Sequence, residues 1–213
     1  MRLTASLLLF LMLVAPLPLL AAEPDLESPH WSVEIKGGLF HPDLPDWSRY
    51  YDSRWMPGYG FAAAYKIIPQ IDIGGSAGSY SKKGHRLNFY HGTPADSQTY
   101  ELNPLELFII LRGQFVQDQW VIPYFGGGWT TLYYRQKLPE GTVRGSAGGY
   151  HLRGGIQLSL DNLDVGASQK MYSDYHILHT YFILEAERTK VIEHAASTDL
   201  GGTAYFAGLL FDF

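Results

Sequence analysis

Ser76 stands in a sequence context that could support nucleophilic chemistry. The run Gly74-Gly75-Ser76-Ala77-Gly78 satisfies the Gly-x-Ser-x-Gly spelling of a hydrolase nucleophile. That chemistry needs a sharp strand-to-helix turn that exposes the serine beside an oxyanion hole. The residues around Ser76 are small and have the pattern of a strand interior. We therefore predict that Ser76 lies within a strand and has no catalytic role.

Ser173 is a second candidate nucleophile, because His176 and His179 follow it closely. A serine is activated by an imidazole that accepts its proton. Outer-membrane lipid A deacylases place a histidine two residues before such a serine, and here that position is Met171. His176 and His179 could still approach Ser173 in space, so a lipid A-modifying hydrolase stays open as an alternative function. No catalytic residue is assigned.

The same two histidines raise the question of a metal. Their spacing of three residues can bind a metal ion on a helix, but no cysteine or carboxylate cluster flanks them. We expect no metal, no cofactor and no enzymatic activity.

What these side chains can do depends on the strands that carry them, and the carboxyl terminus shows the strand pattern most clearly. Residues 205–213 alternate strictly, so that one face carries an apolar series and the other carries Phe206, Gly208, Leu210 and Asp212. The apolar series is Tyr205, Ala207, Leu209, Phe211 and Phe213. This segment resembles the closing strand of bacterial outer-membrane β-barrels, in which such residues look like the signal read by the barrel-insertion machinery.

Period-two alternation recurs along the chain and predicts strands at 31–40, 58–66, 71–80, 100–113, 120–134, 148–160 and 203–213. The segments 41–57, 81–98 and 135–147 lack it and predict exposed loops. Short links are predicted at 67–70 and 116–119. The segment 120–134 is apolar on both faces, so its inward face is undetermined.

Two segments, 163–172 and 178–190, compete for one further strand. Bacterial single-chain barrels have an even number of strands with both termini on the periplasmic side, so only one of the two spans. We favour 178–190, because its Thr180, Phe182 and Leu184 face is apolar and β-compatible. The segment 163–172 is then a candidate for a short helix, capped by Asp161 or Asn162, in a long link at 161–177.

The inward faces of these strands carry charges of both signs. An eight-stranded barrel encloses an interior that side chains just fill. Unpaired charges there are costly, so we expect interlocked ion pairs and a closed lumen. A narrow ion pathway lined by the same groups is the alternative. The predicted lumen charge network is Glu34, Lys36, Lys66, Asp72, Glu106, Arg112, His151, Arg153, Glu185 and Asp212.

The amino terminus has the pattern of a cleaved secretory signal, with Arg2 ahead of an apolar run and Ala21-Ala22 before acidic sequence. We predict a signal peptide at 1–22 and one barrel domain at 23–213. Once the signal peptide with Arg2 is removed, 15 basic and 21 acidic residues give a net charge of −6. This net charge argues against nucleic acid as a partner. The chain has no cysteine, which excludes disulfides and a lipid-modified amino terminus.

The whole pattern resembles the small eight-stranded outer-membrane barrel superfamily, which includes the OmpA transmembrane domain, OmpX and OmpW. The resemblance implies an all-β antiparallel transmembrane barrel in the outer membrane of a Gram-negative bacterium. It also implies a monomer that contacts outer-membrane lipid and lipopolysaccharide. We expect a structural or surface-interaction role, with a small pore as the alternative. The candidates for recognition by the first outer loop are Trp47, Tyr50, Tyr51 and Trp55.

Overall fold

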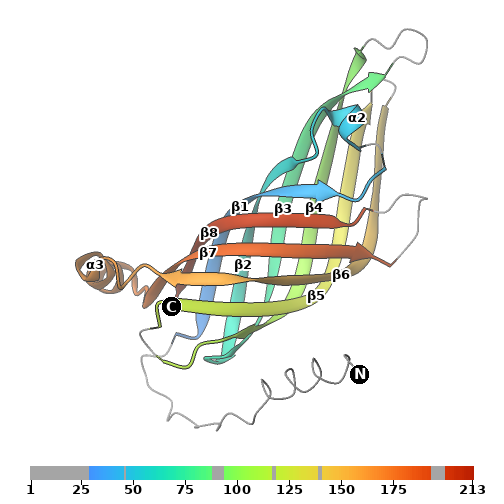
Figure 1. Ribbon diagram of the computed structural model, residues 1–213. Coiled ribbons are helices and arrows are strands. Elements are labelled where there is room, and N and C mark those ends of the chain that lie inside the picture. Colours follow the sequence, from blue (N-terminus) through green and yellow to red (C-terminus); the bar gives the residue numbers. More distant parts are fainter. Residues whose placement is uncertain (1–28, 46, 88–93, 117–118, 139–140, 193–199) are drawn as a thin grey trace, which may run out of the picture.

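The computed structural model describes residues 29–45, 47–87, 94–116, 119–138, 141–192 and 200–213, and the predicted signal peptide lies outside this range. Eight antiparallel strands each pair with the next, and β1 pairs with β8, so the sheet closes into a barrel (Figure 1). The predicted all-β, eight-stranded fold is confirmed. The strands are β1 (Trp31–Pro42), β2 (Met56–Ile68), β3 (Ile71–Leu87), β4 (Pro94–Arg112), β5 (Val121–Leu138), β6 (Gly141–Ser159), β7 (His179–Val191) and β8 (Gly202–Asp212).

The up-and-down order gives the barrel two distinct ends. The carboxyl terminus, the β2–β3 and β4–β5 turns and the β6–β7 link lie at one end, which we call the terminal end. The β1–β2, β3–β4, β5–β6 and β7–β8 connections lie at the other, the loop end. Alternate residues of each strand point into the barrel, as the alternating burial of β1 and β8 shows.

Four neighbouring strands rise well beyond the other four at the loop end. β3 to β6 have 17 to 19 residues, whereas β1, β2, β7 and β8 have 11 to 13 (Figure 1). The predictions of loops at 81–98 and 135–147 were therefore wrong for most of their length. These segments are polar on their outer face because they extend past the apolar part of the wall, and their backbones remain paired strand to strand. We call the extension the tall wall.

The seventh strand is the one favoured from the sequence, and the competing segment is helical. Helix α3 (Val165–Tyr175) lies in the β6–β7 link at the terminal end. Its cap is Asp164, whose carboxylate accepts from the Ala167 N–H at 2.9 Å, so the predicted caps were wrong. Asp161 is engaged elsewhere, since its carboxylate accepts from the Thr180 N–H at 3.1 Å.

The first long connection also contains a helix. The short helix α2 (Trp47–Tyr51) lies within the predicted loop 41–57 and packs against β3. Gly84 of β3 permits this contact, because a Cβ there would lie 2.4 Å from the carbonyl oxygen of Tyr50. In the described part of the chain, no helix is long and apolar enough to cross a membrane.

Candidate functional site

The barrel interior gathers charged side chains from several strands. All ten residues of the predicted lumen charge network are buried, and each comes from the inward face of its strand. Glu187 joins them, although sequence reasoning did not select it. It lies two residues after Glu185 on the same face of β7, so the period-two rule would have found it.

One group of four charges lies nearest the terminal end. Arg112 pairs with Asp72 through Nε and lies 3.5 Å from Asp212 through its Nη1 atom. Lys66 also pairs with Asp212. Two cations therefore face two carboxylates. We call these four residues the lower quartet.

A second group of four lies further along the interior. Lys36 Nζ is 2.6 Å from Glu185 Oε1 and 3.0 Å from Glu34 Oε1. Arg153 Nε is 3.1 Å from Glu185 Oε2, and its guanidinium carbon lies 4.2 Å from the centroid of the Phe108 ring. These four charges, the middle quartet, also balance one another. β5 contributes Tyr124, whose hydroxyl donates to Glu185 at 2.9 Å.

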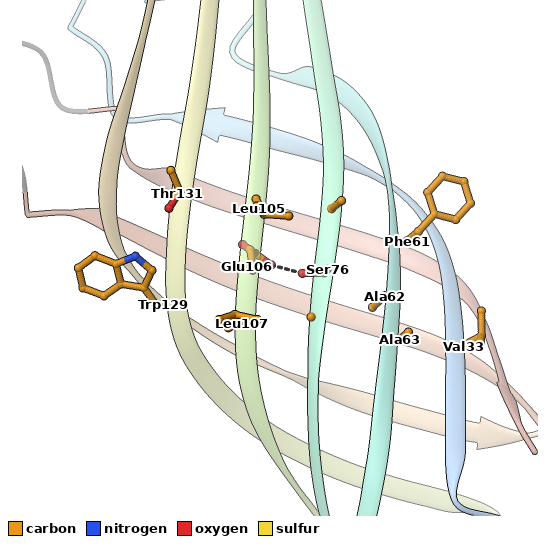
Figure 2. Close-up of a pocket in the computed structure, with 12 residues that line it drawn as sticks. Val33, Phe61, Ala62, Ala63, Ser76, Leu105, Glu106, Leu107, Trp129 and Thr131 are labelled. Atoms are coloured by element: carbon orange, nitrogen blue, oxygen red, sulfur yellow. Dashed lines mark hydrogen bonds between the residues drawn. The ribbon is translucent and has the colours of Figure 1, made fainter.

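Above the middle quartet, carboxyl groups meet hydroxyl and imidazole groups. Glu106 accepts from Ser76 Oγ at 2.6 Å and lies 3.8 Å from His151 Nδ1. Glu187 accepts from Thr189 at 3.4 Å. Among the described residues, no lysine or arginine forms an ion pair with either glutamate. Ser76 thus lies inside the barrel on a strand, and the nucleophile-elbow spelling has no structural counterpart (Figure 2).

The interior of the loop end is filled by apolar and aromatic side chains. Trp47 stacks on Tyr51 with 3.9 Å between ring centroids, and Trp47 meets Tyr100 edge-on at 5.5 Å. We call this cluster the aromatic plug. Its larger members are Phe40, Trp47, Tyr51, Met56, Tyr80, Tyr100, Leu102, Leu132 and Phe206. Burial raises the pKa of the Tyr51 phenol to about 12, so it stays neutral at physiological pH.

This packing corrects part of the predicted recognition surface. Trp47 and Tyr51 are each only 5% exposed, because α2 turns them into the barrel, and they do not form an outward surface. Tyr50 is partly buried against the aromatic plug. Trp55 is exposed and meets Tyr205 edge-on at 5.9 Å, near the outer wall.

The candidate serine on α3 does not meet a histidine. Ser173 Oγ lies 3.2 Å from the carbonyl oxygen of Lys170 and 3.2 Å from the Asp174 carboxylate, and its single hydrogen can be donated to either. His179 lies 2.9 Å from the Asp161 carboxylate instead. His176 closes the helix in the left-handed conformation, with φ of 59°. Within the described residues, no hydrogen bond joins Ser173 to an imidazole, and no group of three metal-ligating side chains is present.

The outer surface of the barrel is apolar around its circumference. Exposed side chains from every strand form this apolar belt, which includes Ile35, Phe61, Ile73, Leu107, Phe125, Leu152, Leu184 and Leu209. Trp31 and Trp120 are both exposed near its edge at the terminal end. In the closing strand, Tyr205, Leu209 and Phe213 are exposed, whereas Phe206, Leu210 and Asp212 are buried. Ala207 and Phe211 share the outward face.

Comparison with known protein families finds no match, and comparison with curated proteins finds none either. Solved structures with the same arrangement are outer-membrane barrels. Neisserial surface protein A aligns with a TM-score of 0.57 and 11% identity over 86% of this chain and 97% of that one. OprG from Pseudomonas aeruginosa aligns with a TM-score of 0.58 and 10% identity, over 87% of this chain and 96% of that one. Ail of Yersinia pestis aligns with a TM-score of 0.53 and 11% identity, over 87% of this chain and 99% of that one. The chain therefore has the fold of the small eight-stranded outer-membrane β-barrels, as its strand pattern predicted.

Proposed function

We propose that this chain is an integral outer-membrane protein of a Gram-negative bacterium, with a closed lumen and a structural or surface-interaction role. The observation that carries the proposal is the apolar belt around a barrel with a charged interior. Leu107, for example, is 68% exposed, while its neighbour Glu106 is buried. In water this arrangement would expose a large apolar surface, whereas in a bilayer the belt meets hydrocarbon and every strand edge is paired.

Three features of the interior support a closed lumen. The two quartets are compact sets of ion pairs, one of which, Arg112 with Asp212, joins opposite strands across the interior, and the aromatic plug fills the space toward the loop end. An ion that crossed the barrel would have to separate these pairs and displace stacked rings. Both steps are costly in a low-dielectric interior. Exposed surfaces, rather than the lumen, are then the parts available to a partner.

Export and insertion belong to the same proposal. Cleavage near residue 22 would release the barrel domain, and the outward series that ends at Phe213 would be read by the barrel-insertion machinery. The protein would act as a monomer, without cofactor or catalysis.

Fractionation and conductance test the proposal together. We expect the full chain to appear in the outer-membrane fraction and to need detergent for extraction. In planar bilayers, the purified protein should give no discrete current steps, while a large porin in the same bilayer serves as the positive control. A compact monomer that dissolves without detergent would contradict membrane insertion. Reproducible channel steps would contradict the closed lumen and favour the pore.

Acyl release tests the hydrolase alternative directly. Purified protein should release no fatty acid from lipopolysaccharide, since the Ser173 hydroxyl hydrogen-bonds to Lys170 and Asp174 rather than to an imidazole. Release that Ser173→Ala abolishes would overturn the proposed absence of catalysis.

A further inference from the structure

The outer face of the tall wall gathers basic side chains. Strand register places Lys83, Thr99, Lys137 and Thr142 in one row across β3 to β6. The next row toward the apolar belt contains Ser81, Glu101, Arg135 and Arg144. With neighbouring strands about 4.8 Å apart, the four basic residues span roughly 14 Å across the strands, from Lys83 on β3 to Arg144 on β6.

Among the side chains that the structure describes, a single carboxylate lies among these four cations. Glu101 Oε1 is 2.7 Å from Lys137 Nζ, and Arg135 Nε donates to Glu101 Oε2 at 2.6 Å. In the described part of the chain, Arg144 and Lys83 form no ion pair. For these described side chains, four positive charges against one negative charge leave an excess of three. We call Lys83, Arg135, Lys137 and Arg144 the basic patch.

An apolar groove lies below the basic patch on the same wall. It has a volume of about 600 Å³ and exists because Ala63, Gly75 and Ala77 are small. Figure 2 shows Phe61 at one side and Trp129 at the other, with Ala63, Leu105 and Leu107 between them.

Between the basic patch and the groove, the wall is polar. The row that contains Asn103 of β4 also contains Tyr133 of β5 and Ser146 of β6. Four residues of β4 separate Glu101, level with the patch, from Leu105 in the groove, which is roughly 13 Å along the strand. The outer wall therefore changes from basic to polar to apolar over the length of one amphiphile.

We propose that this wall binds a phosphorylated glycolipid of the outer leaflet, of the diphosphoryl lipid A type. Phosphates would contact the basic patch, where arginine can pair with two phosphate oxygens at once. The sugar would lie against the polar row, and one acyl chain would occupy the groove. The inference rests on the proposed function, because the groove faces hydrocarbon only if the barrel is inserted in the outer membrane.

Charge complementarity and continuity with the apolar belt favour a lipid over other ligands. A soluble anion would use the basic patch but leave the groove empty, and an apolar protein segment would leave the cations unpaired. A phosphoglycolipid has both chemical parts in the required order, and an ordinary phospholipid lacks the sugar that faces the polar row.

Binding of defined lipids to the full chain in a zwitterionic detergent tests the proposal. The probes are diphosphoryl lipid A, its deacylated diphosphoryl disaccharide and phosphatidylglycerol. Each basic residue near an anionic lipid surface contributes about fivefold in affinity. Arg135→Gln/Lys137→Gln/Arg144→Gln should therefore weaken lipid A binding by about 50-fold or more. Glu101→Gln removes the single carboxylate and should tighten binding about threefold to fivefold.

A groove variant and a charge control separate the two parts of the site. Ala77→Leu fills the groove from its exposed side, so it should weaken binding of lipid A and leave binding of the deacylated disaccharide unchanged. Arg49→Gln/Lys170→Gln/Lys190→Gln removes three exposed charges from other elements and should bind lipid A as the wild type does.

Three results would overturn the assignment. These are wild-type affinity in the patch variant, no tightening in Glu101→Gln, and phosphatidylglycerol bound as tightly as lipid A. Outer-membrane fractionation of each variant keeps the two proposals distinct. A variant that inserts normally but binds lipid A as the wild type does contradicts only the glycolipid site, whereas failure of the wild type to insert contradicts the proposed function.

Discussion

Removing the Arg153 guanidinium from the middle quartet tests the closed interior most directly. Arg153 is 1% exposed, and its Nε lies 3.1 Å from Glu185 Oε2. At an effective dielectric constant of about 20, a charge pair at that distance attracts by about 5 kcal/mol before desolvation is subtracted. Its Nη2 atom is also 3.7 Å from Glu34 Oε2. Arg153→Met keeps much of the side-chain volume but leaves two buried carboxylates facing Lys36 alone.

The expected cost follows from that imbalance. Breaking a buried ion pair by removing one partner typically costs 3–5 kcal/mol. The guanidinium nitrogens of Arg153 lie within ion-pair distance of the carboxylates but are not aligned for hydrogen bonds. We therefore expect the lower end of that range, a loss of about 3 kcal/mol in the free energy of unfolding. The measurement is a reversible urea titration of the protein in phospholipid vesicles, followed by tryptophan fluorescence.

A second variant isolates the electrostatic part of the effect. Arg153→Met/Glu185→Gln leaves Lys36 opposite Glu34, which lies 3.0 Å away, and restores neutrality. It should be more stable than Arg153→Met by about 1 kcal/mol or more. Lys137→Met removes an exposed cation and should cost less than about 1 kcal/mol. If Arg153→Met costs no more than Lys137→Met, the interior is hydrated and the reasoning for a closed lumen fails.

Three further predictions concern the loop end, the tall wall and α3. Gly84→Leu places a Cβ where it would lie 2.5 Å from Tyr51 Cδ1, so α2 should leave the plug and acrylamide should quench more tryptophan fluorescence. At Glu101, hydrogen bonds from Lys137 and then from Arg135 lower the pKa. The contribution of Glu101 to the free energy of unfolding, less than about 1 kcal/mol, is therefore fully present above the pKa that this carboxyl has in the unfolded chain. It is lost as the pH falls through the lower pKa that the carboxyl has in the folded protein. Asp164→Ala removes the α3 cap, destabilising that helix by about 1 kcal/mol and speeding amide exchange at 165–175.

Each of these predictions has its own control. For Gly84→Leu, the control is Gly166→Ala, which also adds a Cβ to a glycine. It lies on α3 at a site with more space, so it should leave quenching unchanged. In Glu101→Gln, the small loss of stability at low pH should disappear. In Asp164→Ala, amide exchange in β7 should match the wild type. Unchanged quenching in Gly84→Leu, a persistent pH effect in Glu101→Gln, or unchanged exchange in α3 would contradict the corresponding prediction.

The inward positions could be predicted because they follow a local rule. In a barrel, every second residue of a strand faces the interior whatever lies elsewhere in the chain. Asp72 and Arg112 were selected from separate strands on that rule alone, and the barrel brings them into contact. Their specific pairing could not be predicted, because partners across the interior depend on strand tilt and register.

The features that the sequence did not reveal depend on distant contacts. Tyr124 lies in a segment that is apolar on both faces, and pairing with β4 and β6 turns its side chain inward. The sequence predicts an outer surface for Trp47, because its segment has no strand or helix periodicity, yet packing on Tyr100 buries it. The sequence of the tall wall resembles that of loops, because strands that project past the apolar belt no longer need apolar residues on their outer face.

Strand β4 shows why alternate residues should affect different properties, with inward residues affecting stability and outward residues affecting lipid binding. Its inward side passes from Arg112 in the lower quartet through Phe108 beneath Arg153 to Glu106, and then to Tyr100 in the aromatic plug. Its outward side passes from the apolar belt to Glu101 beside the basic patch. Substitutions on the inward side should change unfolding and leave lipid affinity alone in the folded fraction. Substitutions on the outward side above the belt should do the reverse. If inward substitutions instead changed affinity at unchanged stability, the ligand would have to enter the lumen, and the outer wall would not be the binding surface.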